Sequence, residues 1–495
     1  MVKEIDADYS QQFLLPPSLE DWVSPDHPAR FIRMFVDSLD MRELCFKERE
    51  SEEGRPNYSN SLLLKIWLYG YYFKHKSSRE LEQACHKEMP LIWLSGMNYP
   101  DHNTLWRFFR ANRLSIKNVF KQTVKLALKN EMVGLALQAV DGTKVLADAC
   151  KRRSFHRGDI KKLLSSLDEM VEERLSEIEE QEERESEFPN FLLPEDLQDK
   201  KKLQALIDDG LKDFSEEEKH RLQRSLKSHL ADLEVSDTDH MNVTDPESRM
   251  MIANGKKEFG YNAQGVVDSQ DQVIVGAKVS QEAIDHHHLT DMIEEARENT
   301  GKESEETVAD AGYFSGEELH KSEEKGHSVL VNVLPTVGKH PCDKSGIFSK
   351  DKFKYDKDND EYICPLGKVL TYRSTTKKKR RRYKVRIYRC QSFRECPHRD
   401  ECSKEKSGRK IERSPYEGAI KKQIHKQKQP GNKELLSKRK VIVEPVFGWI
   451  KHNLGFRRLS YRGLVSVNAQ WNLVCTTINL KKLYKRWQEG NLSFG

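Results

Sequence analysis

The stretch AVDGTKVLADA, residues 139–149, decides the fold because it places one carboxylate, Asp141, within a strand-like run of apolar residues. Two other stretches repeat this arrangement: TVADAGYFSGEE surrounds Asp310, and VEPVFGWIKHNLGFRRL surrounds Glu444. A carboxylate at the edge of an apolar core is costly unless it is paired or binds a cation. Three such acids, brought together by folding, predict a site for divalent metal ions and phosphate chemistry.

Length and charge predict several domains and a nucleic-acid partner. A chain of 495 residues is too long for one compact core, so two or three domains are expected. The charges are nearly balanced, with 84 Lys and Arg against 79 Asp and Glu, but the two signs are segregated. Residues 168–187 are strongly acidic, whereas residues 377–389, 421–440 and 451–462 are basic. The basic runs favour nucleic-acid binding, although each could also be a solvated face.

The sequence also predicts a cellular compartment. The N-terminus is polar and unlike a signal peptide, and no apolar run reaches the roughly 18 residues of a membrane span. Nine cysteines without an export signal favour a reducing cytoplasm, with thiols or metal ligands. We therefore expect a cytoplasmic, nucleoid-associated protein without a membrane contact.

Residues 1–125 are predicted to be helical. The segment 100–114, PDHNTLWRFFRANRL, has Asp101 and Asn103 as candidate N-caps, and an apolar face that contains Leu105, Trp106 and Phe109. Arginines occupy its other face, and Arg107 and Arg110 are candidate DNA-binding residues. A helix-turn-helix-like DNA reader fits this pattern, and so does an ordinary helical domain.

The rest of the chain predicts a mixed α/β domain with two insertions. The α/β domain would comprise residues 134–334 and 436–495, with a helical hairpin inserted at 155–240 and a basic, Cys-rich insert at 335–435. Expected elements are a strand at 134–147, a helix at 288–299 with a Ser315–Glu318 capping box for the next helix, and C-terminal helices at 444–453 and 465–487.

Several motifs together resemble the DDE-type transposases of bacterial insertion sequences. The stretches SSRELEQAC and IWLSGMNYPDHNTLWRFFR resemble the N-terminal domain of that family, and DGTKVLADA its first acidic motif. TDPESRMM and GYNAQGVVD are similar to markers between the first and second acids, ADAGYFS to the second motif, and VEPVFGWIK with GFRRLSYRGL to the third. The resemblance covers nearly the whole chain and is to the group with a Cys-rich insert before the Glu.

The resemblance implies an RNase H-like fold and a function. Asp141 would lie on the first strand, Asp310 at the end of the fourth and Glu444 on a late helix, as the catalytic and metal-binding triad. Two Mg²⁺ or Mn²⁺ ions would be held by the three acids and the substrate phosphate. The protein would bind terminal inverted repeats, cleave double-stranded DNA at the ends and join them to target DNA, as a homodimer in the DNA complex.

The residues taken singly leave alternatives open. Asp141 and Asp310 each precede small residues and could be turn residues. Asp148, on the opposite strand face, is a rival of Asp141, and Glu444 beside Pro445 could be an acid at a helix N-terminus.

The family pattern Y-x2-R-x3-E-x6-K is matched in part. Lys451 fits its last position, but Lys440 stands at the Arg position, next to Arg439, and Ser437 at the Tyr position. Lys can meet a phosphate as a point charge but lacks the bidentate fork of Arg. The predicted DNA-binding residues of this region are Lys440, Lys451, Arg457 and Arg458.

The Cys-rich insert predicts a second metal and a further DNA contact. Four cysteines could bind a structural Zn²⁺ ion, with His398 as an alternative ligand or with free thiols instead: Cys364, Cys390, Cys396 and Cys402. The basic run at 377–382, including Lys377 and Arg380, suits contact with the DNA backbone. The cluster at 286–288 is interpreted as helix-capping and surface histidines.

Two rival functions remain. The departures at Ser437 and Lys440 motivate a DNA-binding regulator that has lost catalysis, whereas the intact acids favour an enzyme. A plain metal-dependent nuclease would use the same acids without strand transfer.

Overall fold

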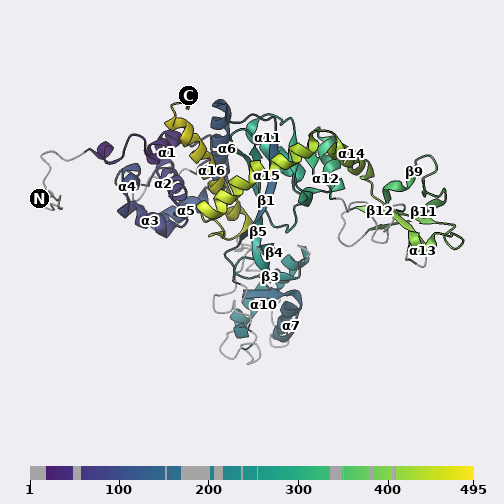
Figure 1. The fold of residues 1–495 in the computed structure, drawn as a ribbon. Coiled ribbons are helices and arrows are strands. Elements are labelled where there is room, and N and C mark those ends of the chain that lie inside the picture. Colours follow the sequence, from purple (N-terminus) through teal and green to yellow (C-terminus); the bar gives the residue numbers. More distant parts are fainter. Residues whose placement is uncertain are drawn as a thin grey trace, which may run out of the picture.

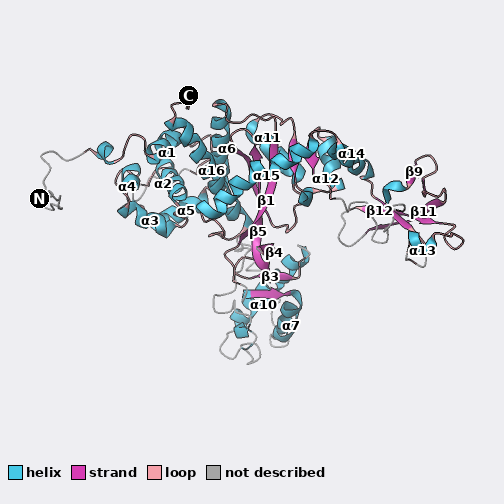
Figure 2. Cartoon of the chain, viewed as in Figure 1, coloured by secondary structure: helices cyan, strands magenta, loops and turns pink. Residues whose placement is uncertain are grey.

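The computed structural model describes residues 18–47, 57–150, 153–168, 201–203, 205, 216–235, 238–253, 255–334, 348, 350–377, 383–403, 405 and 408–494. Helices and strands both contribute to it, as expected for a mixed α/β protein (Figure 2). N-terminal helices lie at one end, a mixed sheet lies at the centre, and two smaller lobes project from it (Figure 1).

A helical bundle forms the N-terminal part of the described chain. Its elements are η1 (Leu19–Trp22), α1 (Pro28–Asp37), α2 (Asn60–Phe73), α3 (Ser78–Lys87), α4 (Met89–Leu94), α5 (His102–Ala111) and α6 (Arg113–Lys129). Side-chain caps fix where two helices begin. Ser77 and Glu80 form a capping box at α3. Asp101 accepts a hydrogen bond from the backbone N–H of Thr104 at α5, as predicted for this residue.

A six-stranded mixed sheet forms the centre. Its strands are β1 (Gln138–Leu146), β4 (Arg249–Ala253), β5 (Lys256–Asp268), β6 (Ile274–Ser280), β7 (Thr307–Ala309) and β8 (Val329–Val331). β5 pairs antiparallel with β1, β4 and β6, whereas β7 pairs parallel with β1 and β8. The parallel register joins Val140 to Ala309. Asp141 and Asp310 therefore follow the same ladder position on neighbouring strands.

Helices cover this sheet and connect it to the N-terminal bundle. They are α11 (Leu289–Thr300), α12 (Gly316–Glu324), α14 (Glu417–Lys428), α15 (Asn432–Gly448), the π-helical turn η6 (Trp449–Asn453) and α16 (Leu464–Gln488). α15 packs on β1, β5 and β7, α11 and α16 pack on β6, and α14 packs on β8. α6 packs against α11 and α16, so one apolar core runs from the bundle into the sheet.

Two lobes have cores of their own. One contains β2 (Ser154–His156), α7 (Arg157–Asp168), α10 (Glu216–Val235) and β3 (His240–Asn242), in which α7 packs on α10 and β2 pairs with β3. The other contains η5 (Lys350–Lys352), β9 (Lys354–Asp356), β10 (Glu361–Ile363), β11 (Val369–Lys377), β12 (Lys384–Cys390), α13 (Arg399–Cys402) and β13 (Lys410–Arg413). In Figure 1 the first lobe extends beyond β4, and the second lies beyond α14.

Several local predictions are wrong. α15 begins at Asn432, so Glu444 lies well inside a helix and is not an acid at its N-terminus. Ser315 makes no side-chain cap; Glu318 instead accepts a hydrogen bond from the backbone N–H of Thr290, 3.0 Å away.

Other errors concern burial and length. β1 is shorter than predicted: it begins at Gln138, whereas the predicted strand begins at residue 134. Trp106 is 39% exposed, because Phe108 takes the inward position on α5. Cys45 and Cys150 are exposed, although their apolar sequence surroundings predict that they lie in the core. His288 precedes α11 without capping it through its side chain. Within the described ranges, no helix is long and apolar enough to cross a membrane.

Candidate active site

Asp141 lies on β1, between β5 and β7, and its side chain is 20% exposed. Its Oδ1 accepts a hydrogen bond from the Gly142 N–H at 2.9 Å, and its Oδ2 lies 3.1 Å from Nη1 of Arg439 on α15. Burial raises the pKa of Asp141 above its usual value, although Arg439 acts in the opposite direction. Asp141 is therefore a partly desolvated carboxylate with one cation beside it.

Asp310 directly follows β7. Its Oδ1 accepts a hydrogen bond from the Gly312 N–H at 2.8 Å and caps the 3₁₀-helix η4 (Ala311–Tyr313). The charge of Asp310 also contributes to the raised pKa of Asp141, as expected of neighbouring like charges. The structure thus brings the first two predicted acids together, and neither is merely a turn residue remote from the other.

Glu444 is placed differently. It is exposed on α15, and no hydrogen bond or ion pair to it is formed within the described part of the chain. Arg439, which meets Asp141, precedes Glu444 by five residues, a rotation of about 140° around a helix at 3.6 residues per turn. Glu444 therefore lies on the helix that covers Asp141, but on a different face from Arg439.

The predicted basic residues flank this region. Lys451, in η6, is half-buried; burial lowers its pKa, and the charge of Asp141 acts in the opposite direction, which places the two near each other. Lys440, Arg457 and Arg458 are exposed. Nη1 of Arg458 also donates a hydrogen bond to the carbonyl oxygen of Ala147, 2.9 Å away, just beyond β1.

Asp285 lies close to both aspartate motifs. Its Oδ1 accepts hydrogen bonds from Nζ of Lys144 (3.0 Å), Nδ2 of Asn262 (2.7 Å) and Nε2 of Gln264 (2.8 Å). Burial alone would raise the pKa of Asp285, but these donors outweigh it and lower the pKa below its usual value. Its carboxylate is therefore ionised and held by three donors.

Tyr313 completes this network. The buried hydroxyl of Tyr313 donates a hydrogen bond to Oε1 of Gln264. Burial, and then the charges of Asp285, Asp141 and Asp310, raise the pKa of Tyr313 well above its usual value. The tyrosine thus lies within electrostatic reach of all three carboxylates and stays protonated as a donor.

The donor set fits a Mg²⁺ or Mn²⁺ ion that also binds substrate. Within the described residues, no group of three or more His, Cys, Asp or Glu side chains could hold a metal ion as it stands. Mg²⁺, however, usually keeps several waters and is bound by one or two carboxylates plus substrate phosphates. Asp141 and Asp310, which are adjacent, oxygen-bearing and partly desolvated, match that requirement.

Comparisons with known families add an independent finding. A model described as a transposase DDE domain matches residues 363–484, and one described as a transposase domain (DUF772) matches residues 17–111. The two matches indicate a DDE-type insertion-sequence transposase. No curated protein matches the chain. The first match contains Glu444, whereas Asp141 and Asp310 lie outside both.

In the transposase, the four cysteines of the predicted zinc site lie in one lobe. Cys364 Sγ accepts a hydrogen bond from the Lys368 N–H at 3.2 Å. Burial raises the pKa of Cys402 to about 11, and the other three cysteines are among the further causes. The cysteines thus lie near one another as free thiols, although they do not form a ready metal site.

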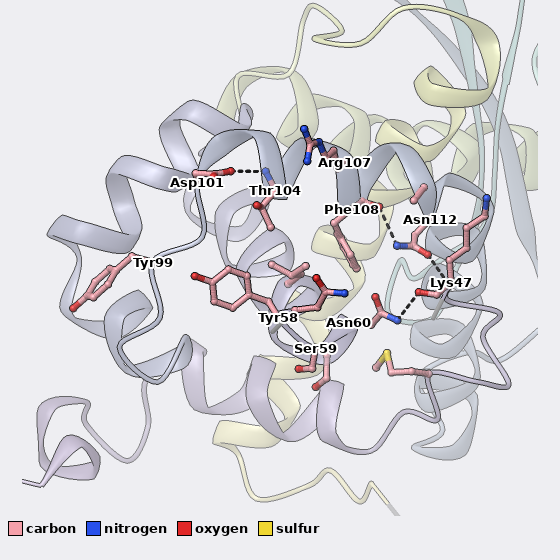
Figure 3. A pocket seen from close by; sticks show the side chains of 15 residues that line it. Lys47, Tyr58, Ser59, Asn60, Tyr99, Asp101, Thr104, Arg107, Phe108 and Asn112 are labelled. Atoms are coloured by element: carbon pink, nitrogen blue, oxygen red, sulfur yellow. Dashed lines mark hydrogen bonds between the residues drawn. The ribbon is translucent and has the colours of Figure 1, made fainter. Parts of the chain in front are cut away.

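A pocket of about 920 Å³ opens on the N-terminal bundle of the transposase (Figure 3). Arg107 on α5 and Lys47 contribute cationic side chains, and Tyr58 and Tyr99 contribute aromatic ones. Phe109, also on α5, stacks on Tyr461 of the GFRRLSYRGL segment at a ring-centroid distance of 4.1 Å. The pocket helix is therefore packed directly on the C-terminal region that follows Glu444.

The other predicted DNA-binding residues are placed unevenly. Arg110 is exposed and stacks over Trp106, with its guanidinium carbon 5.1 Å from the ring centroid. Lys377 is exposed at the end of β11. Arg380 lies outside the described residues. Asp148, the rival of Asp141, forms an exposed ion pair with Arg462 and takes no part in the network around Asp310.

Sequence reasoning missed part of this site. Arg439 was noted only as a neighbour of Lys440, yet it is the cation that meets Asp141. No sequence pattern distinguishes Asp285, Lys144 or Gln264 as a site residue. One signal was available for Asp285: it follows a buried strand on the chain between the two aspartate motifs. Nothing in the local sequence indicates that its partners come from β1 and β5.

Proposed function

We propose that this transposase binds the ends of its element and catalyses metal-dependent cleavage and strand transfer of DNA with Asp141, Asp310 and Glu444. The placement of Asp141 and Asp310 directly after the same paired position, Val140 with Ala309, of two neighbouring parallel strands carries this proposal. A mixed sheet with a first acid on β1, a second directly after β7 and a third on a covering helix supports an RNase H-like catalytic domain.

The acidic residues would bind the metal ions, and the basic residues would contact the DNA. Asp141 and Asp310 would hold Mg²⁺ or Mn²⁺, and Glu444 would join them when α15 and the DNA come together. Such cations lower the barrier to phosphoryl transfer by neutralising charge on the attacking and leaving oxygens. Lys451, beside Asp141, and the exposed Lys440, Arg457 and Arg458 would orient the DNA backbone by contacting phosphates.

The N-terminal bundle would bind the DNA ends. Arg107 and Lys47 line the pocket, and neither forms an ion pair among the described residues, although the charge of Arg107 reaches Asp101. Both can therefore meet phosphates. Arg110 lies on the same helix, and the stacking of Phe109 on Tyr461 ties that helix to the catalytic part. Because transposition needs two ends held together, we propose a homodimer in the DNA complex, in the cytoplasm.

The lobe of β9–β13 would be stabilised by Zn²⁺. Cys364, Cys390, Cys396 and Cys402 offer four sulfur donors, the set that structural zinc prefers. Lys377 and Arg380, in the same region, would contact DNA.

The experiment is cleavage of labelled DNA that carries the element's ends, with Mg²⁺ or Mn²⁺. Wild type should cut and Asp141→Ala should not, whereas Asp148→Ala, a matched change near the end of the same strand, should cut. Cutting without strand transfer would favour a plain nuclease. Binding without cutting under either metal would contradict the proposal and favour a regulator, the function that Ser437 and Lys440 would suit.

A further inference from the structure

Asp285 lies in the connection between β6, which ends at Ser280, and α11, which begins at Leu289. All three of its donors meet the same oxygen, Oδ1. No described residue donates a hydrogen bond to Oδ2. In the Asp285 carboxylate, Oδ1 thus accepts three hydrogen bonds, whereas Oδ2 accepts none from the described residues.

Two glycines, one in each aspartate motif, leave room for this carboxylate. A Cβ at Gly142 would lie 2.9 Å from Oδ1 of Asp285 and 2.4 Å from Nε2 of Gln264. A Cβ at Gly312 would lie 2.9 Å from Oδ1 of Asp310 and 3.5 Å from Oδ2 of Asp285. Neither glycine has a left-handed backbone, so space and not conformational freedom accounts for both.

Asp285 therefore fits between the segments that carry the two acids. Oδ1 of Asp285 lies beside Gly142, which directly follows Asp141. Oδ2 of Asp285 lies toward Gly312, whose backbone N–H donates a hydrogen bond to Asp310. The Lys144 side chain is 19% exposed, and the same carboxylate pairs with its ammonium group. One side chain thus lies beside both motifs and pairs with Lys144, a cation of the first motif.

We propose that Asp285 is a positioning residue of the catalytic site: its carboxylate fixes the spacing of the Asp141 and Asp310 segments and thereby sets their affinity for a divalent cation. This inference rests on the proposed function. Metal ligands depend on the groups that orient them, and loss of such a partner typically weakens metal binding by about 10–100-fold. Replacing Asp285 by Asn removes the negative charge, so the hydrogen bonds from Asn262 and Gln264 become weaker and Lys144 is left as an unpaired positive charge.

A plain structural ion pair is the competing explanation. If Asp285 served only to pair Lys144, removing either partner would have the same effect. If Asp285 positions the two acids, replacing Asp285 and replacing Lys144 should have different effects on cation binding. Loss of Asp285 would weaken cation binding, whereas loss of Lys144 would remove a competing positive charge and leave cation binding intact or tighter.

The test is Mn²⁺ binding to the full-length protein without DNA, followed by electron paramagnetic resonance. We expect Asp285→Asn to bind Mn²⁺ about tenfold more weakly than wild type. Lys144→Met should bind at least as tightly as wild type. Asp291→Asn is the matched control, because Asp291 forms an exposed ion pair with Lys321 on the neighbouring helix α12 and should not change binding.

A second variant approaches the same contact from the opposite side. Gly312→Ala removes no charge but places a methyl group beside Asp310 and Asp285, so it should also weaken Mn²⁺ binding. Thermal unfolding of each variant checks that it is folded; if Asp285→Asn does not fold, Gly312→Ala decides. In cleavage, Asp285→Asn should need more Mg²⁺ for half-maximal rate, with a rate at saturating Mg²⁺ close to that of wild type.

The outcomes separate two failures. If wild type binds no Mn²⁺, either alone or with end-bearing DNA, the proposed function itself is contradicted. If wild type binds but Asp285→Asn binds equally well, or if Asp285→Asn and Lys144→Met weaken binding equally, the positioning role alone is overturned.

Discussion

The sheet end that carries Asp141 and Asp310 and the helix that carries Glu444 contribute to the candidate site in different ways. Asp141 is mostly buried, paired with Arg439 and joined through strand register to Asp310, with Asp285 between their segments. Glu444 is exposed on α15 and has no partner within the described residues. Backbone register fixes the first two acids before any substrate arrives, whereas the third is positioned only by its helix. The difference suggests a preformed half-site that DNA completes.

The largest expected effect separates these two regions directly. Asp310→Asn should abolish Mn²⁺ binding and lower cleavage by on the order of 10³-fold, because several kcal/mol of metal stabilisation are lost. Glu444→Gln should lower cleavage as strongly, yet leave Mn²⁺ binding without DNA near the wild-type level. Metal titration of both variants, together with cleavage rates, tests this. Equal loss of Mn²⁺ binding in both would mean that the acids act as one preformed triad.

Asp245 offers a comparison with a buried acid outside the site. It is fully buried, and its Oδ1 accepts hydrogen bonds from the hydroxyl of Tyr261 (2.8 Å) and the backbone N–H of Gly463 (3.2 Å). Burial raises the pKa of Asp245 to about 6, although its hydrogen bonds from Tyr261 and Gly463 act in the opposite direction. The folded state therefore holds a proton that the unfolded state releases near pH 4.

This predicts how stability depends on pH. The free energy of unfolding should fall by about 3 kcal/mol as pH rises from about 4 to about 6, since protons bind more tightly to the folded state there. Asp245→Asn should remove this loss and leave Mn²⁺ binding unchanged. Thermal unfolding of both proteins at pH 4.5 and 7.5 measures it. An unchanged pH dependence in the variant would show that Asp245 is not the group responsible.

Arg439 tests whether the buried half-site is neutralised without metal. Arg439→Met should lower the free energy of unfolding by roughly 1–3 kcal/mol in metal-free protein, because Asp141 loses a charged partner. The same variant should bind Mn²⁺ more tightly, since no guanidinium competes for the carboxylate. Lys440→Met, one residue along on the exposed face, is the matched control and should change neither quantity. Weaker Mn²⁺ binding in Arg439→Met would instead give Arg439 a role in shaping the site.

The smallest effect is expected at the N-terminal pocket. Arg107→Ala should weaken binding to DNA ends and to unrelated DNA alike, and lower the salt dependence of binding by about one phosphate contact. Cleavage at saturating protein should stay unchanged, because the pocket contains none of the three acids. Binding isotherms at several salt concentrations measure this. A loss confined to end DNA would show that Arg107 reads bases.

The sequence was informative where local pattern decides structure. The strand-like alternation around Asp141 and the short apolar run before Asp310 predicted β1 and β7, and the parallel pairing of these strands places the two acids together. The start of α15 could not be predicted, because Pro445 suggests a first helical turn but lies inside the helix. Because the start of α15 was not predicted, the sequence did not indicate that Arg439, and not Lys440, faces Asp141.

Long-range contacts explain what remained hidden. Asp285 meets Lys144, 141 positions away, and Gln264, 21 positions away, and no local periodicity encodes such pairs. The glycines after Asp141 and Asp310 suggested turns, whereas their role in the fold is to leave space for the Asp285 carboxylate. A glycine that lies next to a candidate catalytic acid, and whose backbone is not left-handed, therefore indicates that another side chain is packed where a Cβ would lie.

The most direct test of the central claim, that Asp141 binds the catalytic cation, is an exchange of metal preference. Asp141→Cys replaces a carboxylate oxygen by sulfur, which accepts Mn²⁺ more readily than Mg²⁺. The account predicts that this variant fails to cut end-bearing DNA with Mg²⁺ and recovers cleavage with Mn²⁺, whereas Asp141→Ala recovers with neither. Cleavage by Asp141→Cys that is the same in both metals, or recovery of Asp141→Ala with Mn²⁺, would contradict it.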